Sequence, residues 1–387
     1  MLQLTAYDLG MWTGSNRDNL TGYVLAGAAA WSALAFGAVD QKWFAPAELA
    51  VILLATVSFW RQDSPSLSRP LQALLMALFA VPLLQLIPLP PGLLALLSEA
   101  RAVLRQALES AGVPTSAWRS ISIYPFATLS AWLRLVCYLL VFTLAVWNYQ
   151  TLHRQPALVG LMLGLGLFEA LYGITQYLTG FPYIFLFHKS AIGPEATGTY
   201  INRNHYSGLL EMILPFLTAK LLSHMDLHSG HQGFVRKVLL APQSSRFLRD
   251  MLVFVIVLLG LLFSLSRAGI AAGLLGLTVA GAIMVQRHRR SGLTLLGLVL
   301  LFGGGYAAWI GLAPFAERLS LLSMDVSETE PRMAIWGDTL RLIKDAPLFG
   351  TGLGTFEWAS LHYQSSLLNL RYEHAHNDLL ETASDLG

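Results

Sequence analysis

The stretch 251–285, MLVFVIVLLGLLFSLSRAGIAAGLLGLTVAGAIMV, consists of two apolar runs that meet at one charged residue, Arg267. Each run comes close to the ~20 residues that an α-helix needs to cross a bilayer. No polar loop separates them, so the sequence predicts a helical hairpin whose turn, with Arg267 in it, lies at a membrane surface. With seven further runs the chain has nine predicted spans: 20–39, 44–60, 71–89, 129–147, 157–178, 205–222, 251–266, 268–285 and 292–312.

The composition supports the same fold class. Of the 387 residues, 55% are hydrophobic and 12% are charged, and the mean hydropathy is +0.54. Soluble domains carry roughly 25% charged residues, so the sequence predicts an all-α polytopic membrane protein. A net charge of +2 without a basic, aromatic-rich run gives no support to a nucleic-acid partner, and we expect none. The single cysteine, Cys137, cannot form an intrachain disulfide or a thiolate metal cluster.

Lysine and arginine in short loops predict the orientation, because positively charged loops stay on the inner side of the membrane. With the N-terminus inside, most of these residues fall in inner loops. The outer short loops then carry Lys42, Lys189, Arg203 and Arg267. Two long segments, 90–128 and 312–378, also fall outside.

The expected organisation follows from this orientation. Residues 1–311 hold the nine spans, with an interfacial helix near 93–111 that has leucines on one face and Arg101 on the other. Residues 312–378 form an outer loop region with helices of its own, and residues 379–387 begin a tenth span. The chain stops one or two turns into that span, so we expect it to be a partial form.

One helix of the outer region has clear end signals. Thr329 can cap a helix that begins at Pro331 and runs to about Asp345, where Pro347 ends it. On that helix Arg332, Trp336, Leu340 and Ile343 fall on one stripe, which we expect to pack down. The glycines after it, Gly350, Gly352 and Gly354, follow no strand, so a turn is favoured over a nucleotide site.

The segment His374-Ala375-His376-Asn377-Asp378 combines two histidines with two candidate helix caps. Residues two apart point to opposite sides of a helix or strand, so the histidines cannot share a metal ion, and we expect no metal site. Asn377 or Asp378 can cap the next helix, with Asp378 and Glu381 at capping-box spacing. His376 can serve as a general base at neutral pH, and Asp378 can orient it.

Arginines at the outer ends of spans have two interpretations. Arg267 and Arg203 can be anchors that reach to the membrane surface, with Asn204 as the cap of the helix beginning near residue 205. They can also bind phosphate, because the planar guanidinium contacts two phosphate oxygens at once and keeps its charge. Arg267 with Arg332 would suit a diphosphate without a divalent metal, and Arg203 would add a further contact.

Three charged residues fall inside predicted spans, where charges are costly. They are Arg134, Glu169 and Glu211. Arg134 and Glu211 lie at similar predicted depth, so we expect them to pair.

Four of these motifs occur in an order that resembles the O-antigen ligase and polymerase superfamily. They are TGTYINRNH at 197–205, SRAG at 266–269, R-x-x-x-W at 332–336 followed by the glycines, and HAHND at 374–378. The resemblance extends from residue 197 to the end of the chain.

This resemblance implies a function and a set of roles. It implies transfer of a glycan from an undecaprenyl-diphosphate carrier to an acceptor hydroxyl, outside the bacterial inner membrane, with inversion and without a metal or other cofactor. His376 would be the base, with His374 as the alternative, and Arg267 with Arg332 would hold the diphosphate. Asn377, Asp378, Asn204 and Trp336 would support the site.

Three alternatives stay open at the level of sequence. The acceptor can be lipid A core, a growing polysaccharide or a protein, which distinguishes a ligase from a chain polymerase or a protein O-oligosaccharyltransferase. A transporter of lipid-linked sugars or other solutes is the main rival, although transporters place polar groups around a midplane site. A membrane scaffold would leave Arg267, Arg332 and His376 without a reason to converge.

Overall fold

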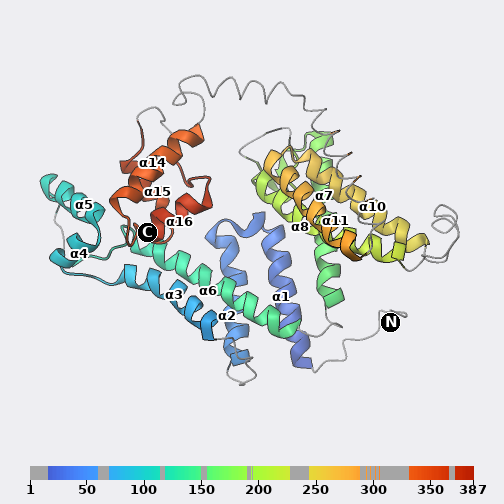
Figure 1. Ribbon diagram of the computed structural model, residues 1–387, viewed down its shortest axis with the longest axis horizontal. Helices are drawn as coiled ribbons and strands as arrows, with labels where there is room; N and C mark the ends of the chain where they lie inside the picture. The colour runs from blue at the N-terminus through green and yellow to red at the C-terminus, as the bar shows by residue number, and fades with distance from the viewer. Residues whose placement is uncertain are drawn as a thin grey trace. The chain divides into compact units, whose positions relative to one another are not determined.

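The structure is a computed structural model (Figure 1). It describes residues 16–59, 69–113, 118–149, 155–189, 193, 195–226, 244–287, 293, 297, 301, 305, 331–365 and 371–387. The chain divides into two compact units. The first unit comprises Met1–Gln62 and Thr143–Gly311, and the second comprises Asp63–Phe142 and Leu312–Gly387.

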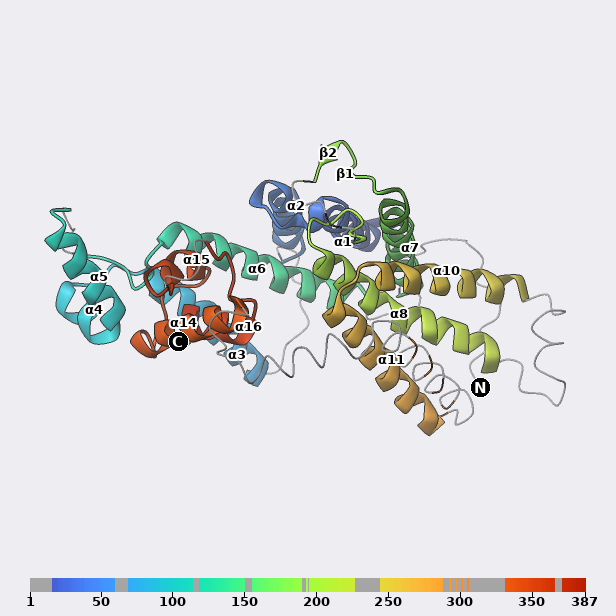
Figure 2. The same ribbon diagram turned by 90° about the horizontal axis from the view of Figure 1, so that it is seen from above.

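The first unit is a bundle of long helices. α8 (Arg203–Asp226) packs against α11 (Arg267–Arg287), and α10 (Ser244–Phe263) packs against both α7 (Gln155–Thr179) and α8 (Figure 2). Tyr206, Leu210 and Leu214 of α8 are fully buried at its centre, against Val257 and Leu261 of α10. Its elements are α1 (Asn16–Leu34), η1 (Phe36–Ala38), α2 (Gln41–Phe59), α7 (Gln155–Thr179), β1 (Tyr183–Ile184), β2 (Phe187–His188), α8 (Arg203–Asp226), α10 (Ser244–Phe263) and α11 (Arg267–Arg287).

The second unit joins segments from two distant parts of the chain. Its apolar core consists of Ile335 and Leu342 from α14, Phe356 and Ala359 from α15, and the loop residue Ala375. The helix α6 starts in this unit and its last residues belong to the first. The elements are α3 (Arg69–Leu86), α4 (Pro91–Leu97), α5 (Glu99–Ser110), α6 (Pro125–Asn148), α14 (Pro331–Asp345), α15 (Phe356–Ala359), η2 (Ser360–His362) and α16 (Asp378–Leu386).

The all-α prediction for a polytopic membrane protein is confirmed. Helices α1, α2, α3, α6, α7, α8, α10 and α11 lie where the first eight spans were predicted. Within the described ranges, three helices are long and apolar enough to cross a membrane: Pro125–Asn148, Pro156–Thr179 and Arg267–Gln286. The predicted span 292–312 lies almost entirely outside the described residues, as does Thr329.

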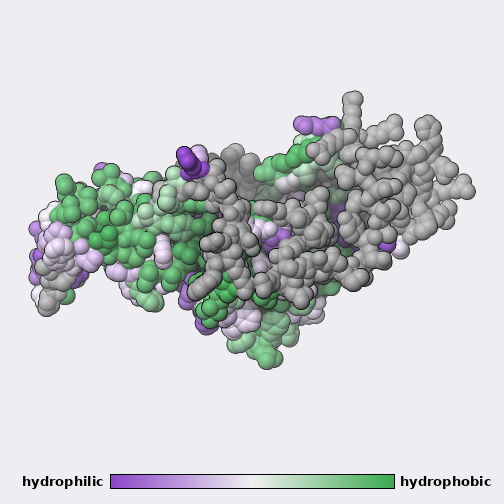
Figure 3. Space-filling view, turned by 90° about the horizontal axis from the view of Figure 1, so that it is seen from below, coloured by the Kyte–Doolittle hydropathy of each residue, from purple (hydrophilic) through white to green (hydrophobic). Residues whose placement is uncertain are grey.

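Two helices of the second unit present apolar side chains on their surfaces. Figure 3 shows hydrophobic residues gathered over α3 and α6. A soluble protein would not leave so many large apolar side chains in water, whereas lipid tails can cover them. The exposed residues on these helices include Met76, Leu83, Leu84, Phe126, Tyr138 and Phe142.

The predicted single helix at 93–111 is wrong in two respects. The chain breaks at Ser98, which has extended backbone angles (φ −149°, ψ 99°) and separates α4 from α5. The Ser98 hydroxyl accepts a hydrogen bond from the Arg101 amide (3.4 Å), so a side chain starts the second helix. Arg101 was expected on the polar face, but it is buried and its Nε donates to the Ser120 carbonyl (3.1 Å). Burial, with Arg119 nearby, lowers the pKa of Arg101 to about 10.

A buried carboxyl in α7 holds the loop that leads into α8. Glu169 has no exposed surface. Its Oε2 accepts from the Thr199 amide (2.8 Å), and its Oε1 lies 2.5 Å from the Thr199 hydroxyl. That hydroxyl also donates to the Ala33 carbonyl at the end of α1 (2.9 Å). One polar side chain therefore ties α7, the α7–α8 loop and α1 together.

A second buried side chain in α7, Gln176, completes this network two turns further along on the same face of the helix. The Gln176 amide donates to the carbonyls of Tyr183 (3.1 Å) and Gly198 (3.0 Å). Its oxygen accepts from the backbone and hydroxyl of Thr197 (3.3 and 3.4 Å). The loop's backbone groups are thus satisfied by α7, which a buried loop requires.

Replacing Glu169 tests whether this network determines the stability of the first unit. Glu169→Ala leaves the Thr199 amide without its partner in a buried site, which should cost about 1–3 kcal/mol and lower the midpoint of thermal unfolding in detergent. Glu169→Gln should stay near wild type, because its oxygen can accept from the Thr199 amide while its nitrogen donates to the hydroxyl.

Glu109→Ala is the control, since Glu109 forms an exposed ion pair with Arg105 that should contribute little. If Glu169→Ala unfolds at the same midpoint temperature as wild type, the network does not stabilise the first unit.

Candidate functional site

Two of the predicted arginines begin adjacent helices in the first unit. Arg203 is the first residue of α8 and Arg267 is the first residue of α11. Between them the Ser266 hydroxyl donates to Asn204 Oδ1 (2.8 Å), which joins the two helix starts directly. Helix N-termini expose free N–H groups and a partial positive charge, which favour anions. This end of the unit therefore combines two guanidiniums with two helix N-termini.

The close approach of α8 and α11 depends on small side chains. A Cβ at Gly269 would lie 2.2 Å from the Ser207 hydroxyl, so only glycine lets the helices meet here. The Ser266 hydroxyl accepts from the Gly269 amide (3.2 Å) and so caps α11. The turn before it contains Leu265 in the left-handed region (φ 52°). The loopless hairpin predicted around Arg267 is present, with Arg267 exposed at its tip.

The predicted cap of α8 is corrected. The cap is Asn202 and not Asn204. The Asn202 side-chain oxygen accepts from the Asn204 amide (2.8 Å), and the Asn202 carbonyl accepts from the Tyr206 amide (3.2 Å). The sequence offers asparagine at both positions, so local pattern could not decide between them. Asn204 lies inside the helix and uses its side chain for Ser266. Arg203 is partly exposed and lies 4.0 Å from Glu195 Oε2.

In the second unit, α14 has the predicted bounds but a different buried face. Ile335, Thr339 and Leu342 are buried, together with Asp338. The expected stripe is rotated away from the core: Arg332 is exposed and Leu340 is 55% exposed. The prediction that Arg332 packs down is therefore wrong. Its guanidinium lies on the solvent side of the first helical turn.

Trp336 connects α14 to the segment that carries the histidines. Its indole N–H donates to the Ala375 carbonyl (3.0 Å), and Ala375 is fully buried. Arg332 lies one turn before Trp336 on the same helix. The structure thus brings Arg332, Trp336 and the His374–His376 segment into one part of the second unit.

The two histidines have different environments. His374 Nδ1 lies 2.9 Å from Glu381 Oε1, and Glu381 Oε2 accepts from the Ala375 amide (2.9 Å). The hydrogen bond to Glu381 raises the pKa of His374. His376 is exposed and has a left-handed backbone (φ 52°), a conformation that is uncommon outside glycine. The carboxylate expected beside His376 is thus beside His374, and it comes from Glu381.

Asn377 caps α16. Asn377 Oδ1 accepts from the amides of Leu379 (3.1 Å) and Leu380 (3.2 Å), so Asn377 is the N-cap and Asp378 is the first helical residue. The capping box expected from Asp378 and Glu381 does not form, because Glu381 turns toward His374 and Ala375. Asp378 is exposed.

A polar centre that sequence reasoning missed holds the glycine turn. The Gln85 amide of α3 donates to the carbonyls of Phe349 (2.7 Å) and Asp385 (2.8 Å), and its oxygen accepts from the Leu353 amide (3.0 Å). Asp385 Oδ2 accepts from the Gly354 amide (2.6 Å). A lone glutamine inside an apolar run was the available signal, since such a residue needs buried partners.

The glycines themselves behave as a fixed turn, as predicted. Gly350, Gly352 and Gly354 all have positive φ (56°, 113° and 73°). A Cβ at Gly352 would lie 2.7 Å from the Ser122 hydroxyl. Among the described residues, no group of three His, Cys, Asp or Glu side chains is arranged to hold a metal ion.

The predicted site residues therefore fall into two groups. Arg203, Asn204 and Arg267 lie together in the first unit. The second unit contains Arg332, Trp336, His374, His376, Asn377 and Asp378. Arg134 belongs to the second unit and Glu211 to the first, so their pairing stays a prediction.

Comparison with known proteins bears on the C-terminal group. Residues 252–387 match the family described as O-antigen ligase. No curated protein and no solved structure matches the chain. The matched residues include Arg267, Arg332 and both histidines, and the family implies glycan transfer in lipopolysaccharide or polysaccharide biosynthesis. The C-terminal part of this polytopic helical membrane protein is therefore an O-antigen ligase family domain.

Proposed function

We propose that the protein transfers a glycan from an undecaprenyl-diphosphate carrier to an acceptor hydroxyl at the periplasmic face of the bacterial inner membrane. The acceptor oxygen attacks the anomeric carbon, and the bond from that carbon to the diphosphate oxygen breaks with its electron pair. A histidine takes the hydroxyl proton. A single displacement of this kind inverts the anomeric carbon and needs no metal.

The observation that carries the proposal is the pair of arginines at the joined starts of α8 and α11. Arg203 and Arg267 flank the hydrogen bond between Asn204 and Ser266. A departing diphosphate gains negative charge, and guanidiniums beside the positive ends of two helix dipoles stabilise that charge. In the second unit, Arg332 is exposed on the first turn of α14 and is a further candidate for contact with the diphosphate.

The proposed base is His376. It is exposed, and its left-handed backbone is the kind of strain that accumulates at functional sites. His374 uses Nδ1 for Glu381 and so helps to hold the segment, together with the bonds from Glu381 to Ala375 and from Trp336 to Ala375. Because a carboxylate on Nδ1 also orients a histidine for catalysis, His374 is the alternative base.

The acceptor defines three forms of the same reaction. Ligation onto lipid A core, extension of a polysaccharide and transfer to a protein hydroxyl share the donor and the chemistry. Transfer in vitro from an undecaprenyl-diphosphate glycan to one acceptor of each class distinguishes them by product.

Histidine variants test the base. His376→Ala should lower the rate of transfer by about 100- to 10,000-fold, since it removes a general base, without loss of folded protein in detergent. His374→Ala and Glu381→Gln should have smaller effects. His362→Ala is the matched control, because His362 is an exposed histidine of the same unit outside the proposed site.

The rates of these variants decide between the two histidines. Full activity of His376→Ala together with loss in His374→Ala would move the base to His374. Activity in both single variants and in the double variant would overturn general-base catalysis by this segment.

Arginine variants test recognition of the diphosphate. Arg267→Lys and Arg332→Lys keep the charge but lose the planar fork, so kcat/KM for the lipid-diphosphate donor should fall roughly 10- to 100-fold. Arg341→Lys is the control on the same helix as Arg332, since Arg341 contacts Asp338 and the Tyr363 carbonyl. Wild-type kcat/KM in both lysine variants would exclude a bidentate diphosphate contact.

A further inference from the structure

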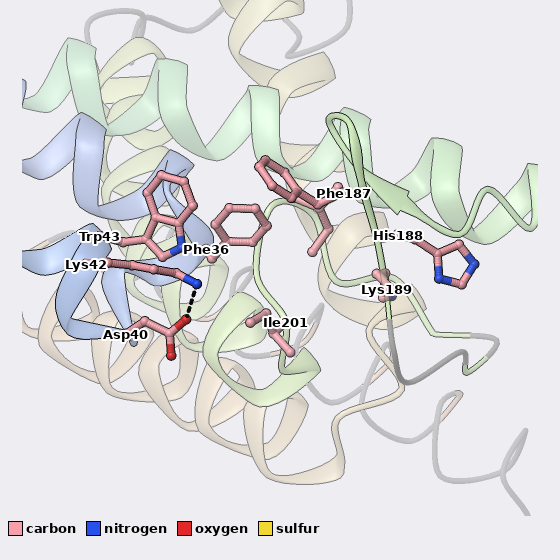
Figure 4. Close-up of a pocket in the computed structure, with 9 residues that line it drawn as sticks. Phe36, Asp40, Lys42, Trp43, Phe187, His188, Lys189 and Ile201 are labelled. Carbon is pink, nitrogen blue, oxygen red and sulfur yellow. Dashed lines mark ion pairs between the residues drawn. The ribbon is translucent and has the colours of Figure 1, made fainter.

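A small cavity lies in the first unit beside the start of α8. It has a volume of about 190 Å³, below the roughly 300–1,000 Å³ of pockets for drug-sized ligands. Figure 4 shows aromatic rings on one side and charged side chains at the edge. The lining residues are Phe36, Asp40, Lys42, Trp43, Ile184, Phe187, His188, Lys189 and Ile201.

Three rings form the apolar wall of this cavity. Phe36 lies between Trp43 and Phe187, with ring centres 5.2 and 5.3 Å away, and Trp43 and Phe187 are 6.2 Å apart. Phe187 meets both neighbours edge-on, at 80° and 81°. Rings at such angles present both faces and edges to the cavity instead of stacking on each other.

The backbone around these rings is held in an unusual conformation. Phe36, Gly37 and Ala38 have φ values of 60°, 70° and 50°, and Phe185 in the β1–β2 turn has 51°. Thus three of the five non-glycine residues with positive φ in the described part of the chain flank this cavity. A Cβ at Gly37 would lie 2.6 Å from the Tyr200 ring, so the turn is pressed against the α7–α8 loop. Such strain marks functional sites more often than plain connections.

The polar groups at the edge are the Lys42–Asp40 ion pair and Lys189. Lys42 Nζ lies 3.4 Å from Asp40 and 5.8 Å above the Trp43 ring. Lys189 Nζ donates to the Thr197 hydroxyl (2.9 Å). Each lysine offers hydrogen-bond donors and Asp40 offers acceptors, while the charges of Lys42 and Asp40 offset each other. This set suits a neutral ligand with many hydroxyl groups better than a phosphate.

We propose that this cavity binds one pyranose ring of a glycan. The C–H groups on the face of a sugar ring pack on aromatic rings, and its hydroxyls exchange hydrogen bonds with Lys42, Asp40 and Lys189. The site rests on the proposed function, because the bound sugar belongs to the glycan that the protein transfers or extends. Ile201, a lining residue, lies two residues before Arg203, so the sugar sits next to the proposed diphosphate contacts.

A neighbouring cavity extends the site. Lys189 also lines a second cavity of about 360 Å³, together with Gln176, Tyr177 and Glu195. Lys189 therefore lies between two cavities, each of which has both aromatic and polar lining residues. An oligosaccharide that spans both would bind more tightly than a single sugar.

Saturation-transfer difference NMR on the purified full chain in detergent tests this proposal. The probes are methyl pyranosides and neutral trisaccharides of glucose, galactose and rhamnose. Wild type should transfer saturation to sugar ring protons. Trp43→Ala should weaken binding of the best trisaccharide about tenfold, which corresponds to the loss of one aromatic contact. Asp40→Asn, at an exposed side chain, should weaken binding of the same trisaccharide severalfold.

Trp118→Ala is the matched control, because Trp118 is an exposed tryptophan (60%) in the other unit and should leave binding unchanged. Absence of saturation transfer in wild type for every probe overturns the proposal. Unchanged binding in both Trp43→Ala and Asp40→Asn also overturns the proposal. Tighter binding of glycerophosphoglycerol, a lipid headgroup probe, than of the sugars overturns it as well.

The donor-transfer assay separates this proposal from the proposed function. Suppose that the wild-type protein binds sugar but transfers no glycan, and that Trp43→Ala loses the binding. This result supports the cavity and overturns the proposed function. Transfer at the wild-type rate by Trp43→Ala, with the KM for donor and acceptor unchanged, overturns the cavity and leaves the function intact.

Discussion

The first unit depends on one buried carboxyl, that of Glu169. Its helix is long and apolar enough to cross a membrane, so its carboxyl needs strong partners. It finds them in Thr199, whose hydroxyl also reaches Ala33. The α7–α8 loop can therefore lie buried against apolar helices without unsatisfied backbone groups. That loop in turn determines where α8 begins, and with it the position of Arg203 and Asn204.

In the second unit, the Gln85 side chain satisfies buried backbone groups in a similar way. This amide bonds three backbone groups from segments that are distant in sequence, and Asp385 bonds a fourth. The glycine turn is thereby joined to α3 and to α16. α14 and Ala375 of the histidine segment share an apolar core with α15, which follows this turn, so Arg332 and His376 are attached to packed elements. Proposed catalytic groups on such supports lose little entropy when a substrate binds.

The corrections share a physical origin. The buried stripe of α14 consists of Ile335, Thr339 and Leu342, each of which lies one residue before a member of the expected stripe. Arg332 therefore does not face the core. Asn202 and Asn377 are the N-caps, although Asn204 and Asp378 are residue types equally common at that position. Glu381 contacts His374 and not the amide that a capping box would use. Asn204 uses its side chain for Ser266, and the buried face of α14 packs against Phe356, Ala359 and Ala375, so contacts between segments decided these two cases.

The sequence alone determined the helical membrane architecture, because runs of apolar residues have few other stable conformations in a bilayer. It also determined the loopless turn at Arg267 and the bounds of α14, since caps and prolines act locally. The tertiary structure decided which faces are buried, which asparagines cap, and which histidine meets a carboxylate. It also assembled the cavity of Phe36, Trp43 and Phe187 from the α1–α2 turn and the β-hairpin, because contacts between distant segments leave no pattern within either one.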